Sequence, residues 1–327
     1  MKNFWKNKRV LVTGASGFIG SHIVNELLNR NAILTCQVHT GKNKYSNFEL
    51  SEKRVRYAKG DLLDFSFCRE IAKNNDVVLN LAAMDGGKIF KDKHEAEIFK
   101  SNIQICLNIL ESARINNINR VLIMSSTDVL SLKDYNKKHI TNDFTIDFPQ
   151  TGFGYAWSKK FSEIASQTYF KQYGLKVAIA RPGSVYGPRD FTGIKRDRVI
   201  PTFIDKALKN ENIIITSERS EKKTFLYISD LIKSLLYLTE SYPMAEPVNL
   251  VGSELIDLKK LALKIVKLTD SKSKIKELRA SSDKKSNVAK VDISLAQEII
   301  NFSPRYSLDD GLKNTIEFYR TNRTEQK

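Results

Sequence analysis

The sequence predicts an α/β fold in which a doubly wound parallel sheet is joined to a smaller, mixed α/β domain. Short apolar runs rich in β-branched residues alternate, up to residue 180, with segments long enough for a helix. The first run leads directly into three glycines and then a helical pattern. After residue 182 the alternation ends, and helices mix with short strands. Strands that alternate with helices pair in parallel, so we expect helices on both faces of the sheet.

The expected strands are short apolar runs. They cover Arg9–Thr13, Ile33–Val38, 55–58, 77–82, 121–124 and 177–180. A helix is expected at 21–30, directly after the glycines, and an amphipathic helix at 308–319. A longer helix is expected at 99–113, where the residues that share one face are Phe99, Ile103, Cys106, Leu107, Leu110 and Ala113.

The composition is that of a soluble globular protein of about two domains. Of the 327 residues, 41% are hydrophobic and 28% are charged. No apolar run approaches the ~20 residues of a membrane span, and the first residues lack the apolar stretch of a secretory signal. We therefore expect a cytoplasmic protein with no membrane partner. Cys36, Cys68 and Cys106 are unclustered, which predicts reduced core residues and no metal site.

The chain is strongly basic. It has 53 Lys and Arg against 37 Asp and Glu, a formal net charge of +16. This charge favours an anionic partner, but the basic residues are spread along the chain. We therefore expect a small anionic ligand rather than nucleic acid.

A phosphate-binding loop is expected between the first strand and the first helix. Glycines at its three key positions allow a tight turn, leave room for a pyrophosphate and let the helix pack closely on the strand. The free N–H groups of the helix N-terminus also favour an anion. This pattern predicts a Rossmann-type dinucleotide site. Its expected contacts are Gly14, Ser16, Gly17, Phe18, Ile19 and Gly20.

The segment after the second strand indicates which dinucleotide binds. NAD-binding domains carry an acidic residue there for the adenosine ribose, whereas residues 36–44 contain no carboxylate. His39, Lys42 and Lys44 would instead attract a 2′-phosphate. NADP(H) is therefore the expected cofactor, with NAD(H) as the alternative. Asp61, after the third strand, is expected either to bind the adenine amino group or to cap a helix.

A second group of residues indicates the chemistry. Tyr155 and Lys159 are four residues apart and so share one face of a helix. A nearby ammonium group favours phenolate, which predicts a lowered pKa for Tyr155 and a general acid/base role. Ser125 and Ser126 follow directly after the fifth strand.

These features together resemble the extended short-chain dehydrogenase/reductase family, the NAD(P)-dependent nucleotide-sugar epimerases, dehydratases and reductases. The similarity runs over nearly the whole chain. It includes the glycine loop, Gly60-Asp-Leu62, Asn80-Leu-Ala-Ala83, Arg181-Pro-Gly-Ser-Val-Tyr-Gly-Pro188, Arg198-Val-Ile-Pro201 and Phe225-Leu-Tyr-Ile-Ser-Asp230.

The resemblance implies roles for individual residues. Ser126 would orient the substrate oxygen, Tyr155 would exchange its proton, and Lys159 would hold the nicotinamide ribose. Further implied cofactor contacts are Leu62, Leu81, Ala82, Ala83 and Pro182. The implied substrate contacts, besides Ser126, are Gly86, Gly87, Ser184, Arg198, Val199, Lys206 and Lys223. Relatives often form homodimers through two long helices, here 99–113 and 154–173, so a homodimer is expected.

The resemblance also implies a division of the chain. Residues 1–182, with about 226–251, would bind NAD(P). Residues 183–225 and 252–327 would bind a nucleoside-diphosphate sugar.

Within the family, several motifs are most similar to those of GDP-L-fucose synthase. That enzyme carries Cys and His where this sequence has Asp128 and Arg198. Asp128 is expected to act as a base, whereas Arg198 is too basic to cycle as an acid at neutral pH and is expected to bind substrate. The 4,6-dehydratases of the family also carry an acid at the position of Asp128.

The expected function is that of an NADP(H)-dependent oxidoreductase acting at C4 of a nucleoside-diphosphate sugar, with reduction of a 4-keto sugar favoured. Three alternatives stay open. They are a C4 epimerase with tightly bound NAD, a 4,6-dehydratase, and a non-catalytic nucleotide- or RNA-binding protein on the same fold.

Overall fold

The computed structural model describes residues 3–39, 54–130, 152–191, 198–215, 222–277 and 291–322. Two of the residues predicted to bind the cofactor, Lys42 and Lys44, lie outside these ranges.

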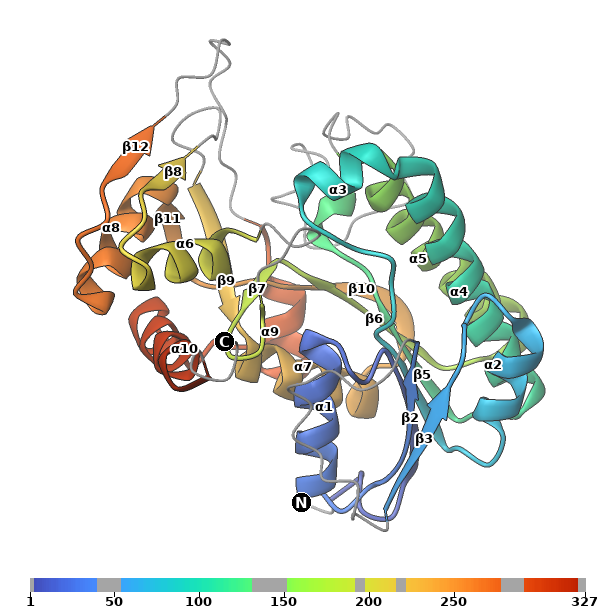
Figure 1. Ribbon diagram of the computed structural model, residues 1–327. Helices are drawn as coiled ribbons and strands as arrows, with labels where there is room; N and C mark the ends of the chain where they lie inside the picture. The colour runs from blue at the N-terminus through green and yellow to red at the C-terminus, as the bar shows by residue number, and fades with distance from the viewer. Residues whose placement is uncertain are drawn as a thin grey trace.

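A seven-stranded parallel sheet forms the larger part of the molecule (Figure 1). Its order is β10-β6-β5-β4-β1-β2-β3, so the chain runs outward from β1 in both directions. The strands are β1 (Arg9–Thr13), β2 (Ile33–Val38), β3 (Val55–Lys59), β4 (Val77–Asn80), β5 (Arg120–Met124), β6 (Val177–Pro182) and β10 (Met244–Leu250). Strands β4 and β6 are buried along their whole length, as strands covered on both faces must be.

Helices cover both faces of this sheet (Figure 1). On one face lie α1 (Phe18–Asn29), α7 (Ile228–Ser241) and α9 (Ser294–Ile300). On the other face lie α2 (Phe65–Ala72), α4 (Glu95–Ile115) and α5 (Phe153–Tyr173), with the short α3 (Lys88–Lys93) ahead of α4. Helices α4 and α5 approach closely at Gly154, where a Cβ atom would lie 2.4 Å from the carbonyl oxygen of Glu95.

The remaining elements form a smaller part that lies beside the carboxyl ends of the strands (Figure 1). Its three-stranded sheet has the order β11-β9-β7, built from β7 (Ser184–Tyr186), β9 (Lys222–Tyr227) and β11 (Leu255–Asp257). A second sheet pairs β8 (Ile213–Ile215) with β12 (Ile275–Glu277). The helices here are α6 (Val199–Leu208), α8 (Leu258–Thr269) and α10 (Leu308–Asn322). The described residues include no helix long and apolar enough to cross a membrane.

The structure corrects three local expectations. Strand β4 ends at Asn80 and not at residue 82, because the amides of Leu81 and Ala82 donate to the Thr13 hydroxyl. The buried face of α4 does not include Leu107, which is 37% exposed. Asp64 caps α2, accepting from the amides of Ser66 and Phe67, so the capping alternative for Asp61 is wrong.

Candidate active site

The glycine loop between β1 and α1 requires glycine at its two ends. Gly14 has a φ of +62°, and a Cβ there would lie 3.0 Å from the Cα of Ala82. At Gly20 a Cβ would lie 2.2 Å from the carbonyl oxygen of Gly14, so any side chain would push α1 away from the loop. Glycine here brings the N-terminus of α1 close to the end of β1, as a dinucleotide loop requires.

The loop fits a pyrophosphate. The N-cap residue of α1, Gly17, offers no side-chain acceptor, and the first turn of the helix holds no acidic residue. The first amides of α1 therefore face no competing negative charge, and the helix dipole favours an anion. The loop and the first turn also contain Ser16, Phe18 and Ile19. Together these residues are suited to hold the diphosphate of NAD(P).

The end of β2 holds the loop in place. Gln37 is buried; its side-chain oxygen accepts from the Gly14 amide, and its side-chain nitrogen donates to the Gly60 carbonyl. His39 is exposed directly after the strand. Asp61 is also exposed, and its carboxylate accepts from the Leu63 amide. Among the described residues from 33 to 39, none carries a carboxylate that could hold the adenosine ribose hydroxyls.

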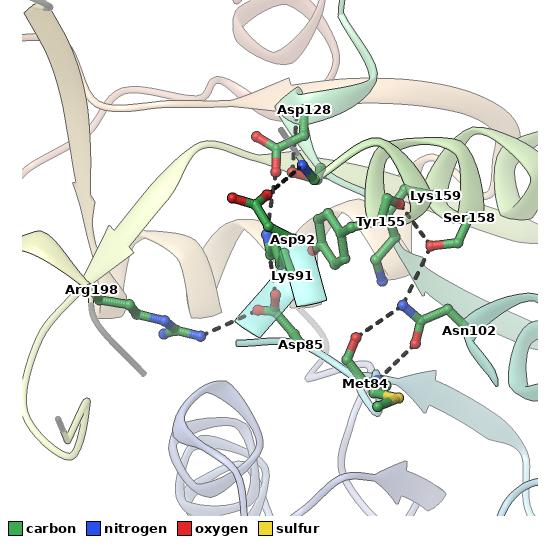
Figure 2. Close-up of polar contacts among 12 residues, drawn as sticks. Met84, Asp85, Lys91, Asp92, Asn102, Asp128, Tyr155, Ser158, Lys159 and Arg198 are labelled. Carbon is green, nitrogen blue, oxygen red and sulfur yellow. Dashed lines mark hydrogen bonds and ion pairs between the residues drawn. The ribbon is translucent and has the colours of Figure 1, made fainter. Parts of the chain in front are cut away.

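Buried Asn side chains fix the loops on the α4 side of the sheet. Asn102 accepts from the Met84 amide at 2.7 Å and donates to the Met84 carbonyl at 3.1 Å. It also contacts the Ser158 hydroxyl, which in turn donates to the carbonyl of Tyr155 (Figure 2). Asn102 therefore links the loop after β4 to the first turns of α5. Asn108 binds the carbonyl of Leu62 in the same way.

Ser126, Tyr155 and Lys159 come together at the carboxyl end of β5. Ser126 follows the strand and caps the short 3₁₀ turn η1 (Thr127–Val129), accepting from the Asp128 amide. The Lys159 ammonium donates to the carbonyl of Met124 at 2.8 Å and lies 5.5 Å from the centre of the Tyr155 ring. The Ser126 hydroxyl lies close enough to the Tyr155 phenol to act on its pKa. The three predicted side chains therefore form one cluster.

The environment of Tyr155 keeps its phenol protonated. Burial raises the pKa of Tyr155 well above its usual range, and the carboxylates of Asp85 and Asp128 raise it further. Arg198 and the Ser126 hydroxyl act in the opposite direction but do not outweigh these effects. The expectation that the pKa of Tyr155 moves toward neutrality is therefore wrong for this structure. Burial also lowers the pKa of Lys159.

A chain of alternating charges surrounds Tyr155 (Figure 2). The Lys91 ammonium lies 3.2 Å from an Asp85 oxygen and 3.6 Å from an Asp128 oxygen. Arg198, at the start of α6, lies 3.5 Å from the other Asp85 oxygen and 2.8 Å from Asp190. Burial raises the pKa of Asp85, but Lys91 and Arg198 outweigh this, so its pKa stays below the usual value. Asp85 therefore remains a carboxylate.

Lys91 and Asp85 are site residues that the sequence interpretation missed. Asp85 belongs to the motif that ends in Gly86 and Gly87, and Lys91 follows that motif by four residues. The position of this segment directly after β4, at the carboxyl edge of the sheet, was the signal that could have identified both residues. Asp128 reaches the same cluster, as predicted, with 53% of its side chain exposed.

A buried ion pair behind Ser126 was also missed. The Arg181 guanidinium makes two hydrogen bonds of 2.6 Å to the Glu163 carboxylate. The Ser125 hydroxyl donates to the same carboxylate at 2.5 Å, and both charged side chains are 2% exposed. This contact ties β6 and α5 to the turn that carries Ser126.

The other predicted site residues lie on several separate elements. Gly86 and Gly87 are buried directly before α3, and Pro182 ends β6. Val199 is the first residue of α6, and Lys206 lies in its last turn. Ser184 and Lys223 lie on the adjacent strands β7 and β9. The described residues include no group of His, Cys, Asp and Glu that could hold a metal ion.

A parallel sheet with a glycine-rich first turn, and a Ser, Tyr and Lys cluster at its carboxyl edge, define an NAD(P)-dependent oxidoreductase of the extended short-chain dehydrogenase/reductase class. The sequence matches the NAD dependent epimerase/dehydratase family over residues 10–250. The chain therefore belongs to this family. The predictions of family and of an enzyme are confirmed, over the alternative of a non-catalytic binding protein.

Two relatives from streptomycetes are similar over almost the full length of both chains. The dTDP-4-dehydro-6-deoxy-D-allose reductase of Streptomyces sp is 33% identical over 98% of this chain and 98% of its own. The enzyme of the same name from Streptomyces bikiniensis is 32% identical over 97% of each chain. The closer similarity to GDP-L-fucose synthase stays a prediction.

Solved structures share the fold. An epimerase from Methanothermobacter thermautotrophicus has a TM-score of 0.87 at 22% identity, covering 99% of this chain and 95% of its own. The UDP-glucose 4-epimerase of Thermotoga maritima has a TM-score of 0.82 at 23% identity, covering 96% and 99%. They confirm the predicted Rossmann-type α/β architecture.

Proposed function

We propose that the protein is an NADP(H)-dependent reductase of the C4 ketone of a nucleoside-diphosphate sugar. The observation that carries this proposal is the cluster of Ser126, Tyr155 and Lys159 at the carboxyl end of β5, where the Lys159 ammonium lies 5.5 Å from the centre of the Tyr155 ring. Burial and two carboxylates raise the pKa of the phenol, so it is protonated. A protonated phenol is a proton donor, and a carbonyl that is being reduced needs one. The names of the two streptomycete relatives support a 4-keto-6-deoxy sugar as the substrate class.

In the proposed reaction a dinucleotide held by the glycine loop would supply the hydride that reduces C4 of the sugar. The Ser126 hydroxyl holds the ketone oxygen. Tyr155 donates its phenolic proton to that oxygen as negative charge develops on it, which leaves the phenolate. Lys159, held by the Met124 carbonyl, stabilises the phenolate and is assigned to the nicotinamide ribose.

NADP(H) is the proposed cofactor because the end of β2 offers a 2′-phosphate no repulsion. Gln37 is neutral and already bound to the glycine loop, and His39 is exposed next to it. The remaining proposed contacts are Leu62, Leu81, Ala82, Ala83 and Pro182, which line the carboxyl ends of the neighbouring strands, with Lys42 and Lys44 retained from the sequence.

The proposed substrate site lies between the two parts of the molecule. Arg198 reaches from α6 to Asp85 at the end of the large sheet, so the two parts meet beside Tyr155. We assign the diphosphate to Arg198, Lys206 and Lys223, and the sugar to Gly86, Gly87, Ser184 and Val199. Lys223→Ala should raise KM for the nucleotide sugar, and an unchanged KM would remove Lys223 from this site.

The test of the proposed function is cofactor turnover. Purified protein is mixed with NADPH and a panel of 4-keto nucleotide sugars, and absorbance at the nicotinamide band is followed. Consumption of NADPH with at least one ketone is expected. Interconversion of 4-epimers without net NADPH consumption would indicate a C4 epimerase instead.

Asp128→Asn separates reduction from dehydration. Asp128 lies at the exposed end of the cluster and pairs with Lys91, so a plain C4 reductase should keep at least about a tenth of its rate without this carboxylate. A dehydratase that uses Asp128 for proton transfer should be nearly abolished, and its product would be a ketone formed from a 4-hydroxy sugar.

A homodimer through α4 and α5 is also proposed. Large apolar side chains are exposed on these two helices at Leu107, Ile115, Phe153 and Phe161. Phe161→Glu should turn a dimer into a monomer in sedimentation experiments because it places a charge among apolar surfaces. A wild-type protein that sediments as a monomer would rule the arrangement out.

A further inference from the structure

Lys91 is fixed against Tyr155 by its surroundings. Its ammonium lies 3.6 Å from the centre of the Tyr155 ring, closer than that of Lys159. Its side chain is only 18% exposed and makes ion pairs with both Asp85 and Asp128. Figure 2 shows Lys91 and Lys159 on either side of the phenol.

The short helix that carries Lys91 is itself tied to α5. Asp92 accepts a hydrogen bond from the amide of Gly152, the N-cap residue of α5. The stem of Lys91 lies beside this residue, since a Cβ at Gly152 would be 3.6 Å from the Cδ of Lys91, an ordinary van der Waals distance. The stem of Lys91 and the helix that bears Tyr155 are therefore held together on the side from which the ammonium approaches the ring.

The charged groups around the phenol come from five places in the fold. Asp85 precedes α3, Lys91 is on α3, Asp128 is on η1, Lys159 is on α5, and Arg198 is the N-cap residue of α6. The two carboxylates raise the pKa of Tyr155 and Arg198 lowers it. Lys91 is the cation that pairs with both carboxylates, so it offsets the charges that most oppose ionisation of the phenol.

We propose that Lys91 is a positioning residue that makes Tyr155 a strong enough acid to donate its proton. This inference rests on the proposed reduction. A cation over a tyrosine ring is attracted to its negative face, and it stabilises the phenolate more than the neutral phenol. When the Tyr155 O–H bond breaks and the proton passes to the oxygen of the ketone, the charge left on the phenolate is balanced by Lys91 as well as by Lys159.

Removing the charge of Lys91 should raise the pKa of Tyr155 for two reasons. The phenolate loses a nearby cation. The carboxylates of Asp85 and Asp128 both lose their ion pair with Lys91, although Asp85 keeps the one with Arg198. An opposite charge within a few ångströms shifts the pKa of a group by about 1 to 3 units. Because Lys91 is partly exposed, we expect its removal to raise the pKa of Tyr155 by about 1 to 2 units. A weaker acid donates its proton more slowly, so kcat should fall about tenfold to a hundredfold.

The pKa of the phenol can be measured directly after Tyr155 is replaced by 3,5-difluorotyrosine. This residue is more acidic than tyrosine, so it loses its proton at a lower pH, where the protein stays folded. The pKa of this one phenol is then followed by fluorine NMR. Lys91→Met should raise it by about 1 to 2 units, and Lys91→Arg should restore it to within about 0.3 units. Asp85→Asn should lower it, because it removes a carboxylate and keeps Lys91.

Lys93→Met is the matched control. Lys93 is exposed two residues away on the same helix, so this variant should leave the pKa unchanged. Urea unfolding of each variant shows whether it is folded. If Lys91→Met and Asp85→Asn both leave the phenol within about 0.3 units of the parent protein, the inference is overturned.

Kinetics then separate this inference from the proposed function. With NADPH and a 4-keto nucleotide sugar, Lys91→Met should lower kcat about tenfold to a hundredfold, change KM less than about threefold, and be rescued by Lys91→Arg. Rescue by Arg together with the pKa shift supports the role of Lys91. If the fluorinated phenol shifts but the wild-type protein reduces no 4-keto sugar, the proposed function fails and the electrostatic role of Lys91 stands. If reduction occurs without the shift, Lys91 alone is misassigned.

Discussion

Tyr155 is the proposed proton donor, and burial together with the carboxylates of Asp85 and Asp128 raises the pKa of its phenol. Tyr155→Phe removes only the hydroxyl, so the fold and the binding of NADPH should be kept. The rate of reduction should fall by ~10²–10⁴, the usual cost of losing a positioned acid. The measurement is kcat with the best 4-keto substrate, with NADPH binding followed by calorimetry. Tyr173→Phe, at an exposed tyrosine on the same helix, is the control. A wild-type rate in Tyr155→Phe would refute the mechanism.

His22 should make the folded state sensitive to mild acid. Burial lowers its pKa to about 4, although its ring hydrogen-bonds to the carbonyl of Pro188. Between this value and the unfolded pKa of about 6.5, the unfolded chain binds the proton more readily, so stability falls as the pH drops through this window. His22 alone should cost about 2 kcal/mol of unfolding free energy between pH 7 and pH 5.

Urea unfolding at the two pH values measures this cost. His22→Gln should show a smaller loss between pH 7 and pH 5 than the wild type, by about the same 2 kcal/mol. Equal losses in the two proteins would show that His22 is not the responsible group.

Sequence patterns identify single site residues well when the signal is local. Gly14, Tyr155 and Lys159 could be predicted because each lies within a short motif whose spacing carries the chemistry. Lys91, Asn102 and the pKa of Tyr155 could not, because they depend on contacts between residues far apart in the chain. Lys91 lies against the ring of a residue 64 positions later, and no periodicity of a single segment reports such a contact.

At the scale of elements, α5 and β6 share the buried pair of Glu163 and Arg181. Glu163→Gln would leave the Arg181 cation buried without its partner, which typically costs about 3 to 5 kcal/mol. The free energy of unfolding, measured with urea, should fall by that amount. Glu111→Gln removes the partner of Arg114, which is 37% exposed, and should cost less than about 1 kcal/mol. Similar losses of unfolding free energy in the two variants would contradict the expectation that breaking the buried ion pair costs more than breaking the exposed one.

The elements themselves followed from hydrophobic periodicity, with errors where side chains intervene. Strand β4 is shorter than its apolar run because the Thr13 hydroxyl takes the amides of Leu81 and Ala82. Helix α4 has a different buried face from the one predicted, since it also buries the polar Asn102 and Asn108. A hydrophobic pattern does not report polar residues that are buried for their hydrogen bonds.

For the whole molecule, the net charge of +16 should favour the more anionic dinucleotide. NADPH should bind more tightly than NADH, as measured by calorimetry, and the difference should shrink as ionic strength rises from about 0.01 M to about 0.15 M. His39→Asp should reduce the preference because it adds a repulsive carboxylate at the exposed end of β2. Equal binding of the two dinucleotides at low salt would contradict the proposal that the end of β2 favours the 2′-phosphate of NADPH.

The order of the large sheet also bears on how the protein is made. Strand β6 is buried on both faces and needs β10 along its free edge, but residues 183–243 separate the two. A nascent chain that has reached residue 182 therefore has a bare apolar strand edge and lacks α7, which packs against α1 and β6. Such an edge is a template for pairing with other chains. Growth of the polypeptide past residue 250 is thus the step that protects it from aggregation, and chaperones that bind extended apolar segments would act before that point.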